Sequence, residues 1–169
     1  MKKLISDRTR VSKTVTFDAA HRLPFHKGLC KNLHGHTYKL EVFFELTPYG
    51  QSQKEANKEE FVVDFGEMKE IINKAVVSRL DHALICCYED TELFEAAQAL
   101  GTKVCILPHE TTAENIVLDI HYWLTERLTL DNLPEVIVPK IKLWETPNSC
   151  VTYDFKEEDT EDWGGEDNA

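Results

Sequence analysis

Three histidines near the start of the chain have the residue type and spacing of a metal site. His21, His34 and His36 fall within sixteen residues. Since one residue separates His34 from His36, an extended strand points both side chains to the same face. Zinc binds imidazole readily, and three histidines leave its fourth tetrahedral position open for water or substrate. The spacing therefore predicts a zinc site, and unrelated surface histidines are the alternative interpretation.

A thiol accompanies these histidines. Cys30 precedes His34 by four residues, which places it at the edge of the predicted site. It could act as a base, because a nearby cation or metal lowers the pKa of a thiol. It could also be a fourth zinc ligand, which would close the site, or an ordinary loop cysteine. His26 in the same stretch is expected to be a solvated loop residue.

A carboxylate and an imidazole stand side by side at Asp81 and His82, where a helix is expected to end. Near a thiol, such a pair can relay protons in the way that hydrolytic triads do. The alternative is that the two residues only decorate a helix C-terminus. Together with Cys30 and the histidines, they become candidates for a proton relay.

Glu145 shares the strand parity of Ile141 and Leu143, so its carboxylate should point into the protein. An unpaired charge in the interior is costly, and such a group usually has a fixed partner. The partner could be an internal lysine or arginine. It could instead be a ligand with two adjacent N–H groups, as a pterin or guanine ring has.

The elements that must position these residues are strands at both ends of the chain. Apolar side chains recur at every second residue in four stretches, which predicts two strand pairs. His34 and His36 keep the parity of the second stretch, and they meet His21 only if the first two strands form a hairpin. A turn at 147–149 predicts a second hairpin. The four stretches are 15–21, 38–46, 140–146 and 151–155.

Helices are predicted between the strand pairs. Asp64 begins a capping box that is followed by apolar residues at helical spacing, and Thr111 begins another. Thr112, inside the second box, fits helix capping fully, although a cap also exposes backbone N–H groups to a ligand. The predicted helical spans are 64–80, 91–100 and 111–128.

The order of strand pair, helices and strand pair predicts an α+β fold with antiparallel pairing. The polar stretch 47–60, which carries Pro48 and Gly50, is predicted to be a long exposed loop. Residues 1–155 are predicted to form a single domain. Seven acids against one lysine make 156–169 an acidic tail that is predicted to be disordered.

Composition and charge argue against several classes of protein. The formal net charge is −11, of which the tail supplies −6, and no basic stripe points to nucleic acid. No segment has the length and apolar character of a membrane span or a signal peptide. Five cysteines at irregular positions do not make a disulfide framework, so a reducing cytoplasm is expected. Cys86 and Cys87 are expected to be reduced residues beside a helix.

Six motifs, taken together and in order, resemble one family. It is the 6-pyruvoyl-tetrahydropterin synthase / 6-carboxy-tetrahydropterin synthase family of tunnelling folds (T-folds), and the resemblance runs from about Lys13 to Phe155. Three residues between the cysteine and His-Gly-His resemble the 6-carboxy branch, which serves queuosine (7-deazapurine) synthesis. The motifs are Phe-Asp-Ala-Ala-His-Arg-Leu at 17–23, Cys-x-x-x-His-Gly-His-Thr-Tyr at 30–38, Val-Asp-Phe-Gly at 63–66, Leu-Asp-His at 80–82, Thr-Ala-Glu-Asn-Ile at 112–116 and Trp-Glu-Thr-Pro at 144–147.

The resemblance implies a role for each candidate residue. Cys30 would be the base that moves protons along the substrate side chain, with Asp81 and His82 as relay. Glu145 would anchor the pterin ring and, as a further catalytic residue, could be coupled to the relay. Thr112 would join it in binding substrate. The ligands of the implied Zn²⁺ would be His21, His34 and His36.

The resemblance also implies a reaction and an assembly. The substrate would be 7,8-dihydroneopterin triphosphate, converted to 6-carboxy-5,6,7,8-tetrahydropterin with release of acetaldehyde and triphosphate. The T-fold pairs two antiparallel hairpins with helices packed on one face, and its subunits close into a barrel, commonly as a dimer of trimers. Sites then lie between subunits, so Asp81 and His82 would serve a neighbour's Cys30.

Some features leave other outcomes open. The chain could be the pyruvoyl-forming synthase, which eliminates triphosphate without side-chain cleavage, or an aldolase-like variant. From another class, it could be a non-catalytic zinc module whose acidic tail recruits a partner.

Arg22, Lys27 and Lys31 are candidates to bind triphosphate, and each can equally be a solvated surface charge. Thr111 stands where the family often has proline, and the 47–60 stretch and the tail are additional.

Overall fold

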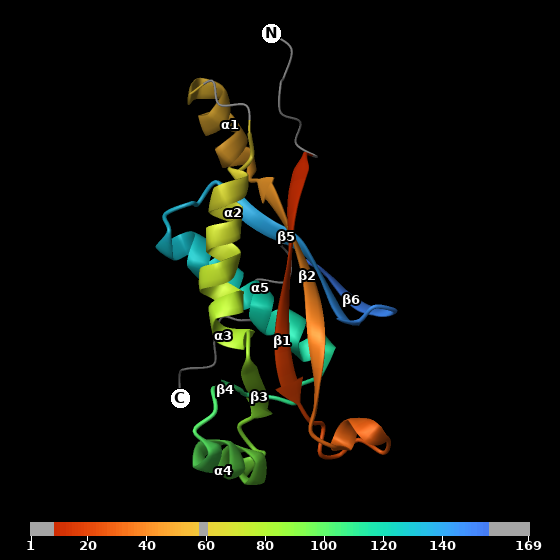
Figure 1. The fold of residues 1–169 in the computed structure, drawn as a ribbon. Helices are drawn as coiled ribbons and strands as arrows, with labels where there is room; N and C mark the ends of the chain where they lie inside the picture. Colours follow the sequence, from red (N-terminus) through yellow and green to blue (C-terminus); the bar gives the residue numbers. More distant parts are fainter. Residues whose placement is uncertain (1–8, 58–60, 156–169) are drawn as a thin grey trace, which may run out of the picture.

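The computed structural model describes residues 9–57 and 61–155. In this part of the chain one six-stranded sheet carries helices on its faces (Figure 1). The elements in chain order are β1 (Arg10–His21), η1 (Leu29–Lys31), β2 (His34–Leu46), α1 (Pro48–Asn57), α2 (Phe65–Ile72), η2 (Asn73–Val77), α3 (Ser78–Leu80), β3 (Ala83–Cys87), α4 (Thr91–Leu100), β4 (Val104–Leu107), α5 (Ala113–Leu130), β5 (Val136–Thr146) and β6 (Ser149–Asp154).

The first predicted hairpin is present. β1 and β2 pair antiparallel along their whole lengths, with Phe17 opposite Tyr38 and His21 opposite His34. Less exposed and more exposed residues alternate along both strands, and from Phe17 and Tyr38 onward every second residue is buried, because strand side chains alternate between the two faces of a sheet. β2 extends back to His34, so the histidines of this strand share the parity of its buried residues, as expected.

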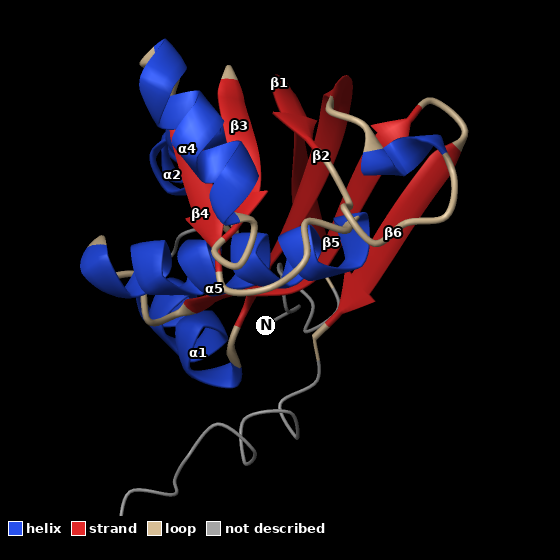
Figure 2. Cartoon of the chain, turned by 90° about the horizontal axis from the view of Figure 1, so that it is seen from below, coloured by secondary structure: helices blue, strands red, loops and turns tan. Residues whose placement is uncertain are grey.

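The second hairpin, β5 with β6, is also confirmed. It joins the first because β5 pairs antiparallel with β2, and the strand order is β4-β3-β1-β2-β5-β6. β5 begins at Val136, earlier than the predicted start at Lys140. The sheet curves as a single layer, with α5 against one side of it (Figure 2).

Two further strands were not predicted. β3 and β4 pair parallel to each other, and β3 pairs parallel with the end of β1, so the sheet is mixed and not purely antiparallel. All five residues of β3 are buried, which removes the polar and apolar alternation that reveals a strand in a sequence. Cys86 and Cys87 lie within β3 as free cysteines, and Cys86 packs against Leu93 and Ala97 of α4, so it is a reduced residue beside a helix, as expected.

The long helices cover one face of the sheet. Asp64 caps α2 as predicted, by accepting hydrogen bonds from the backbone N–H groups of Gly66 and Glu67. α5 begins one residue later than the predicted capping box, because Thr112 and not Thr111 is the N-cap. α4 is the exception in position: its Leu93 and Ala97 pack with Leu84 and Cys86 in a cluster separate from the main core.

The predicted exposed loop at 47–60 is wrong over most of its length, because residues Pro48–Asn57 form α1. Proline is tolerated in the first turn of a helix, so Pro48 marks the start of this helix and not a loop. Gly50 is buried, and a Cβ atom there would lie 2.4 Å from the backbone oxygen of Glu135. The glycine therefore permits close packing, a reason that local sequence does not reveal.

The predicted acidic tail, 156–169, lies outside the described residues. Within 9–57 and 61–155, none of the helices combines the length and the apolar character needed to cross a membrane.

The contact at Gly50 makes a prediction about stability. Gly50→Ala should lower the free energy of unfolding by about 1–3 kcal/mol, because the added methyl group overpacks against Glu135. In a helix without such a contact, glycine to alanine would raise the free energy of unfolding. The sign of the change therefore shows whether the contact exists. Urea denaturation measures the effect. Gln53→Ala, at an exposed position of α1, is the control and should stay within about 0.5 kcal/mol of the wild type. An increase in stability for Gly50→Ala would show that α1 does not pack as described.

Candidate functional site

The structure brings the three predicted histidines together at one end of the first hairpin. His21 ends β1, and His34 lies directly opposite it at the start of β2, with His36 two residues further along. One potential ligand atom from each ring lies within 4.8 Å of the others. The ring of His21 lies 4.7 Å from that of His34 and 5.3 Å from that of His36, measured between centroids. The group therefore has the composition and spacing to hold a metal ion.

The hydrogen bonds of His21 and His34 use Nδ1 of each ring and leave Nε2 free. Nδ1 of His21 donates to the backbone oxygen of Thr111 at 2.8 Å, and Nδ1 of His34 to that of Asn32 at 2.8 Å. A proton on Nδ1 leaves the lone pair of Nε2 available for a metal, which is the usual arrangement of a histidine ligand. Nε2 of His21 and Nε2 of His36 are buried without a hydrogen-bond partner among the described residues. Buried ring nitrogens without a hydrogen-bond partner fit a metal site.

Burial also favours the neutral form of His21. The side chain is almost wholly buried, and desolvation lowers the pKa of His21 below its usual value. The Thr111 carbonyl and the charge of Glu145 oppose this shift but do not reverse it. A neutral imidazole is the form that binds a metal.

Thr111 positions His21, a role that sequence patterns did not indicate. Its carbonyl accepts the hydrogen bond from His21, while its hydroxyl donates to the backbone oxygen of Arg22 at 3.1 Å. Thr111 is completely buried. These two bonds tie the start of α5 to the end of β1. A polar residue just before a helix cap was the available signal, but capping explained it equally well.

Arg22 is engaged within the protein. Its guanidinium donates to both carboxylate oxygens of Asp90, at 2.6 and 2.7 Å, and to Glu92 at 2.9 Å. These bonds, first of all those to Asp90, raise the pKa of Arg22 and lower that of Asp90. Arg22 is therefore neither a solvated surface charge nor a free cation for triphosphate in this structure.

Glu145 lies against the histidine cluster. Its Oε1 is 3.5 Å from Nε2 of His21 and 3.9 Å from Nε2 of His36, and the side chain is 28% exposed. The pairing of β5 with β6 shifts register between Trp144 and Thr146, so Glu145 occupies a β-bulge. Bulges re-aim side chains and are common next to active sites. The carboxylate lies beside the histidines and is partly exposed, so a ligand can reach it.

Tyr38 completes the surroundings of the cluster and was not predicted as a site residue. It is fully buried, with its ring stacked on Phe17 at 5.1 Å and 5.5 Å from the ring of His36. Its hydroxyl has no hydrogen-bond partner among the described residues. Burial, assisted by the charge of Glu145, raises the pKa of Tyr38. Its alternating position on β2 had marked it only as a core residue.

Cys30 lies in the loop between β1 and β2, on the short turn η1, with a half-buried side chain. Its carbonyl accepts a hydrogen bond from the backbone N–H of Leu23 at 2.9 Å, which folds the loop back on itself. The group of potential metal ligands contains the three histidines and does not include Cys30. His26 is exposed, and its Nδ1 accepts from the backbone N–H of Gly28. The catalytic role of Cys30 stays a prediction.

Asp81 and His82 form a pair. Oδ2 of Asp81 lies 3.1 Å from Nδ1 of His82, and its Oδ1 accepts from the backbone N–H of Asp18 at 3.0 Å. The bond from Asp18 is the main reason that the pKa of Asp81 lies below its usual value. His82 has a positive φ of 57° and is mostly exposed, so a bend of the backbone presents its ring to solvent.

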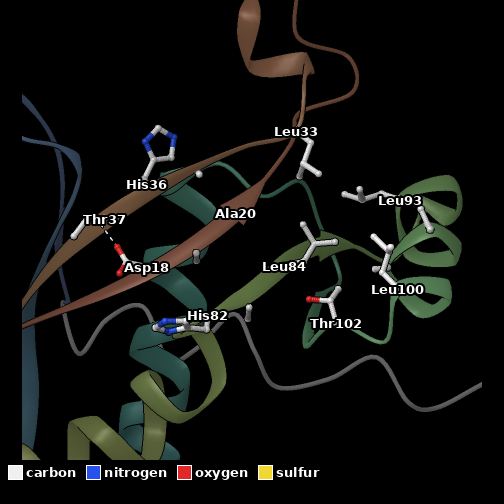
Figure 3. A pocket seen from close by; sticks show the side chains of 15 residues that line it. Asp18, Ala20, Leu33, His36, Thr37, His82, Leu84, Leu93, Leu100 and Thr102 are labelled. Carbon is white, nitrogen blue, oxygen red and sulfur yellow. Dashed lines mark hydrogen bonds between the residues drawn. The ribbon is translucent and has the colours of Figure 1, made fainter.

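This pair lies apart from the histidine cluster of its own chain. Asp18 precedes His21 by three residues on β1, a separation of about 10 Å along a strand, and its parity is opposite. His36 and His82 point away from each other across the sheet (Figure 3). Both residues line one pocket of about 600 Å³, whose far wall includes Leu93 and Leu100 of α4.

The side chain of Thr112 is occupied by helix capping. Its hydroxyl oxygen accepts from the backbone N–H of Asn115 at 3.3 Å, at the start of α5. The neighbouring Thr111 carbonyl contacts His21, so this helix start lies next to the cluster. The predicted contact of Thr112 with substrate stays a prediction.

Comparison with known proteins identifies relatives of this chain. The family model described as 6-pyruvoyl tetrahydropterin synthase matches residues 10–156. A protein of Haemophilus influenzae named 6-carboxy-5,6,7,8-tetrahydropterin synthase is 38% identical over 149 residues, covering 85% of this chain and 97% of the relative. One of the same name from Aquifex aeolicus is 32% identical over 163 residues, covering 85% and 96%.

Solved structures agree on the fold. An uncharacterized protein from Wolinella succinogenes matches with a TM-score of 0.66 at 18% identity, covering 88% of this chain and 98% of its own. The 6-pyruvoyl tetrahydropterin synthase of Caenorhabditis elegans matches with a TM-score of 0.58 at 20% identity, covering 88% and 96%. The predicted T-fold is thereby confirmed for the single chain. With the family model matching most of its length, the chain belongs to the 6-pyruvoyl tetrahydropterin synthase family.

Proposed function

We propose that this protein is a 6-carboxy-5,6,7,8-tetrahydropterin synthase of the cytoplasm. It would convert 7,8-dihydroneopterin triphosphate to 6-carboxy-5,6,7,8-tetrahydropterin, releasing acetaldehyde and triphosphate, as a lyase of queuosine (7-deazapurine) synthesis. The observation that carries the proposal is the cluster of His21, His34 and His36 with the Glu145 carboxylate beside it. The names of the relatives support the choice of product.

The residues of the cluster fit a zinc ion. His21, His34 and His36 would hold it, since Nε2 of His21 and of His36 are buried and have no hydrogen-bond partner in the described chain. Bound zinc would acidify the vicinal hydroxyls of the substrate side chain and polarise a developing carbonyl. The Thr111 carbonyl keeps His21 in the tautomer that such binding needs.

The other residues would bind the substrate and move protons. Glu145 would anchor the pterin through two adjacent N–H groups, because a carboxylate accepts such a pair with both oxygens. Thr112 would add a contact from the start of α5. Cys30 would take a proton from the side chain as the base, and His82, oriented by Asp81, would relay it.

An assembly of several chains would join these parts. Asp81 and His82 lie on the other side of the sheet from the histidine cluster of their own chain. We therefore propose that they serve the Cys30 of a neighbouring subunit, in a homo-oligomer arranged as a dimer of trimers. The exposed ring of His82 is available for such a contact.

The pyruvoyl-forming reaction is the second candidate. It uses the same type of site and keeps all carbons of the side chain, and the matching family model is described by that name. A non-catalytic zinc module is a third and distant candidate.

Product analysis tests the proposed function. Zinc-loaded protein incubated with 7,8-dihydroneopterin triphosphate should release acetaldehyde and a 6-carboxy pterin, both detectable by mass spectrometry. Retention of every side-chain carbon would identify the pyruvoyl-forming reaction instead. Unchanged substrate would favour a non-catalytic zinc module.

Metal content tests the role of the cluster. His36→Ala should lower the zinc content well below one ion per subunit, because it removes a ligand whose free nitrogen is buried. His26→Ala is the matched control from the neighbouring loop, and it should keep the zinc content of the wild type. Atomic absorption after dialysis measures both. Equal zinc content in the two variants would rule out the cluster as the metal site.

Mixing two inactive variants tests the shared site. Cys30→Ala should abolish turnover while keeping zinc near one ion per subunit, and His82→Ala should abolish turnover too. If each site draws Cys30 and His82 from different subunits, random mixed oligomers regain activity in about a quarter of their sites. Activity after co-expression or joint refolding provides the measurement. If confirmed mixed oligomers recover no activity, both residues belong to a site of one chain. If Cys30→Ala loses zinc, the thiol is a metal ligand.

A further inference from the structure

The hydroxyl of Tyr38 is polar, wholly buried and unpaired. The residue is 0% exposed, and its oxygen lacks a hydrogen-bond partner in the described chain. A hydroxyl buried without a partner costs free energy, whereas phenylalanine would fill the same space at no such cost. The ring already has its packing partner in Phe17. The core therefore needs the ring of Tyr38 but gains nothing from its hydroxyl.

The sheet places Tyr38 next to Glu145. β2 and β5 pair with Lys39 opposite Trp144 and Leu40 opposite Leu143. The pairing ends there, and Tyr38 and Glu145 are the next residues along the two strands. They lie close enough for the charge of Glu145 to help raise the pKa of Tyr38. Both side chains lie on the face of the histidine cluster, since the ring of Tyr38 contacts that of His36 and Glu145 lies beside His21.

Glu145 in turn receives no hydrogen bond from His21. Its Oε1 faces Nε2 of His21 at 3.5 Å, but the proton of His21 is on Nδ1, where it is donated to the Thr111 carbonyl. Two acceptors thus face each other, and this contact cannot hold the carboxylate in one orientation. A carboxylate that must accept two N–H groups of a flat ring requires a fixed orientation. A phenol, with an ordinary pKa near 10, is protonated at neutral pH and can donate.

We propose that Tyr38 is a positioning residue, whose hydroxyl donates a hydrogen bond to the Glu145 carboxylate when the pterin is bound. The bond orients the carboxylate toward the ring N–H groups and away from the histidines. It also satisfies the hydroxyl that the ligand-free protein leaves unpaired. This inference rests on the proposed function, because it assigns Tyr38 a role in holding the same pterin.

The zinc-loaded protein and its Tyr38→Phe variant provide the test, with 7,8-dihydroneopterin as the probe. Removal of an unpaired hydroxyl should leave the melting temperature unchanged or raise it. The dissociation constant of the pterin, measured by fluorescence titration, should rise about tenfold. A purely structural role of the hydroxyl predicts a lower melting temperature and an unchanged dissociation constant. Tyr122→Phe, at an exposed position of α5, is the matched control and should alter neither quantity.

A double-mutant cycle tests whether Tyr38 acts through Glu145. In the Glu145→Gln background, which should itself weaken pterin binding, Tyr38→Phe should cause little further loss. A dissociation constant of Tyr38→Phe within twofold of the wild type would overturn the proposal. So would an equal loss in both backgrounds, because the hydroxyl would then act independently of Glu145. If the wild type itself fails to bind the probe while Tyr38→Phe folds normally, the proposed function fails and this inference with it.

Discussion

The antiparallel register of β1 and β2 is the constraint on which the rest of the site depends. It sets His21 opposite His34 and Ala19 opposite His36, so residues from two strands meet on one face. A shift by one residue would turn every side chain of a strand to the other face and disperse the cluster. The register is held by a buried stripe from Phe17 and Tyr38 to Phe44, which can bury its apolar area in only one alignment. The same packing that stabilises the core thus fixes the metal-binding geometry.

A second set of contacts fixes the ring of His21 from outside the hairpin. The Thr111 carbonyl holds Nδ1, and the Thr111 hydroxyl holds the backbone of the next residue, Arg22. Arg22 then reaches Asp90, the N-cap of α4, through two charge-assisted hydrogen bonds. The starts of α5 and α4 are therefore both tied to the end of β1. Polar contacts of this kind preorganise a ligand, because they fix both its tautomer and its direction.

The histidine cluster and the proposed proton relay lie on opposite sides of one chain. Thr111, His21 and Glu145 gather on the helix-covered face, whereas His82 is exposed beyond Asp18 on the other. Within one chain, strand parity turns the two groups to opposite faces of the sheet. This separation is the physical reason for proposing a site that is completed by another subunit.

Sequence alone determined the parts that local periodicity and spacing encode. Alternation revealed both hairpins, and the one-residue spacing of His34 and His36 revealed their shared face. It missed β3, which is buried on both sides and shows no alternation, and α1, whose Gly50 is explained by a contact with Glu135 far along the chain. Only the tertiary structure decided that Thr111 orients His21, that the Tyr38 hydroxyl is unpaired beside Glu145, and that His82 faces away from the cluster. These relations join residues distant in sequence, and they follow from strand order and packing, which local patterns do not specify.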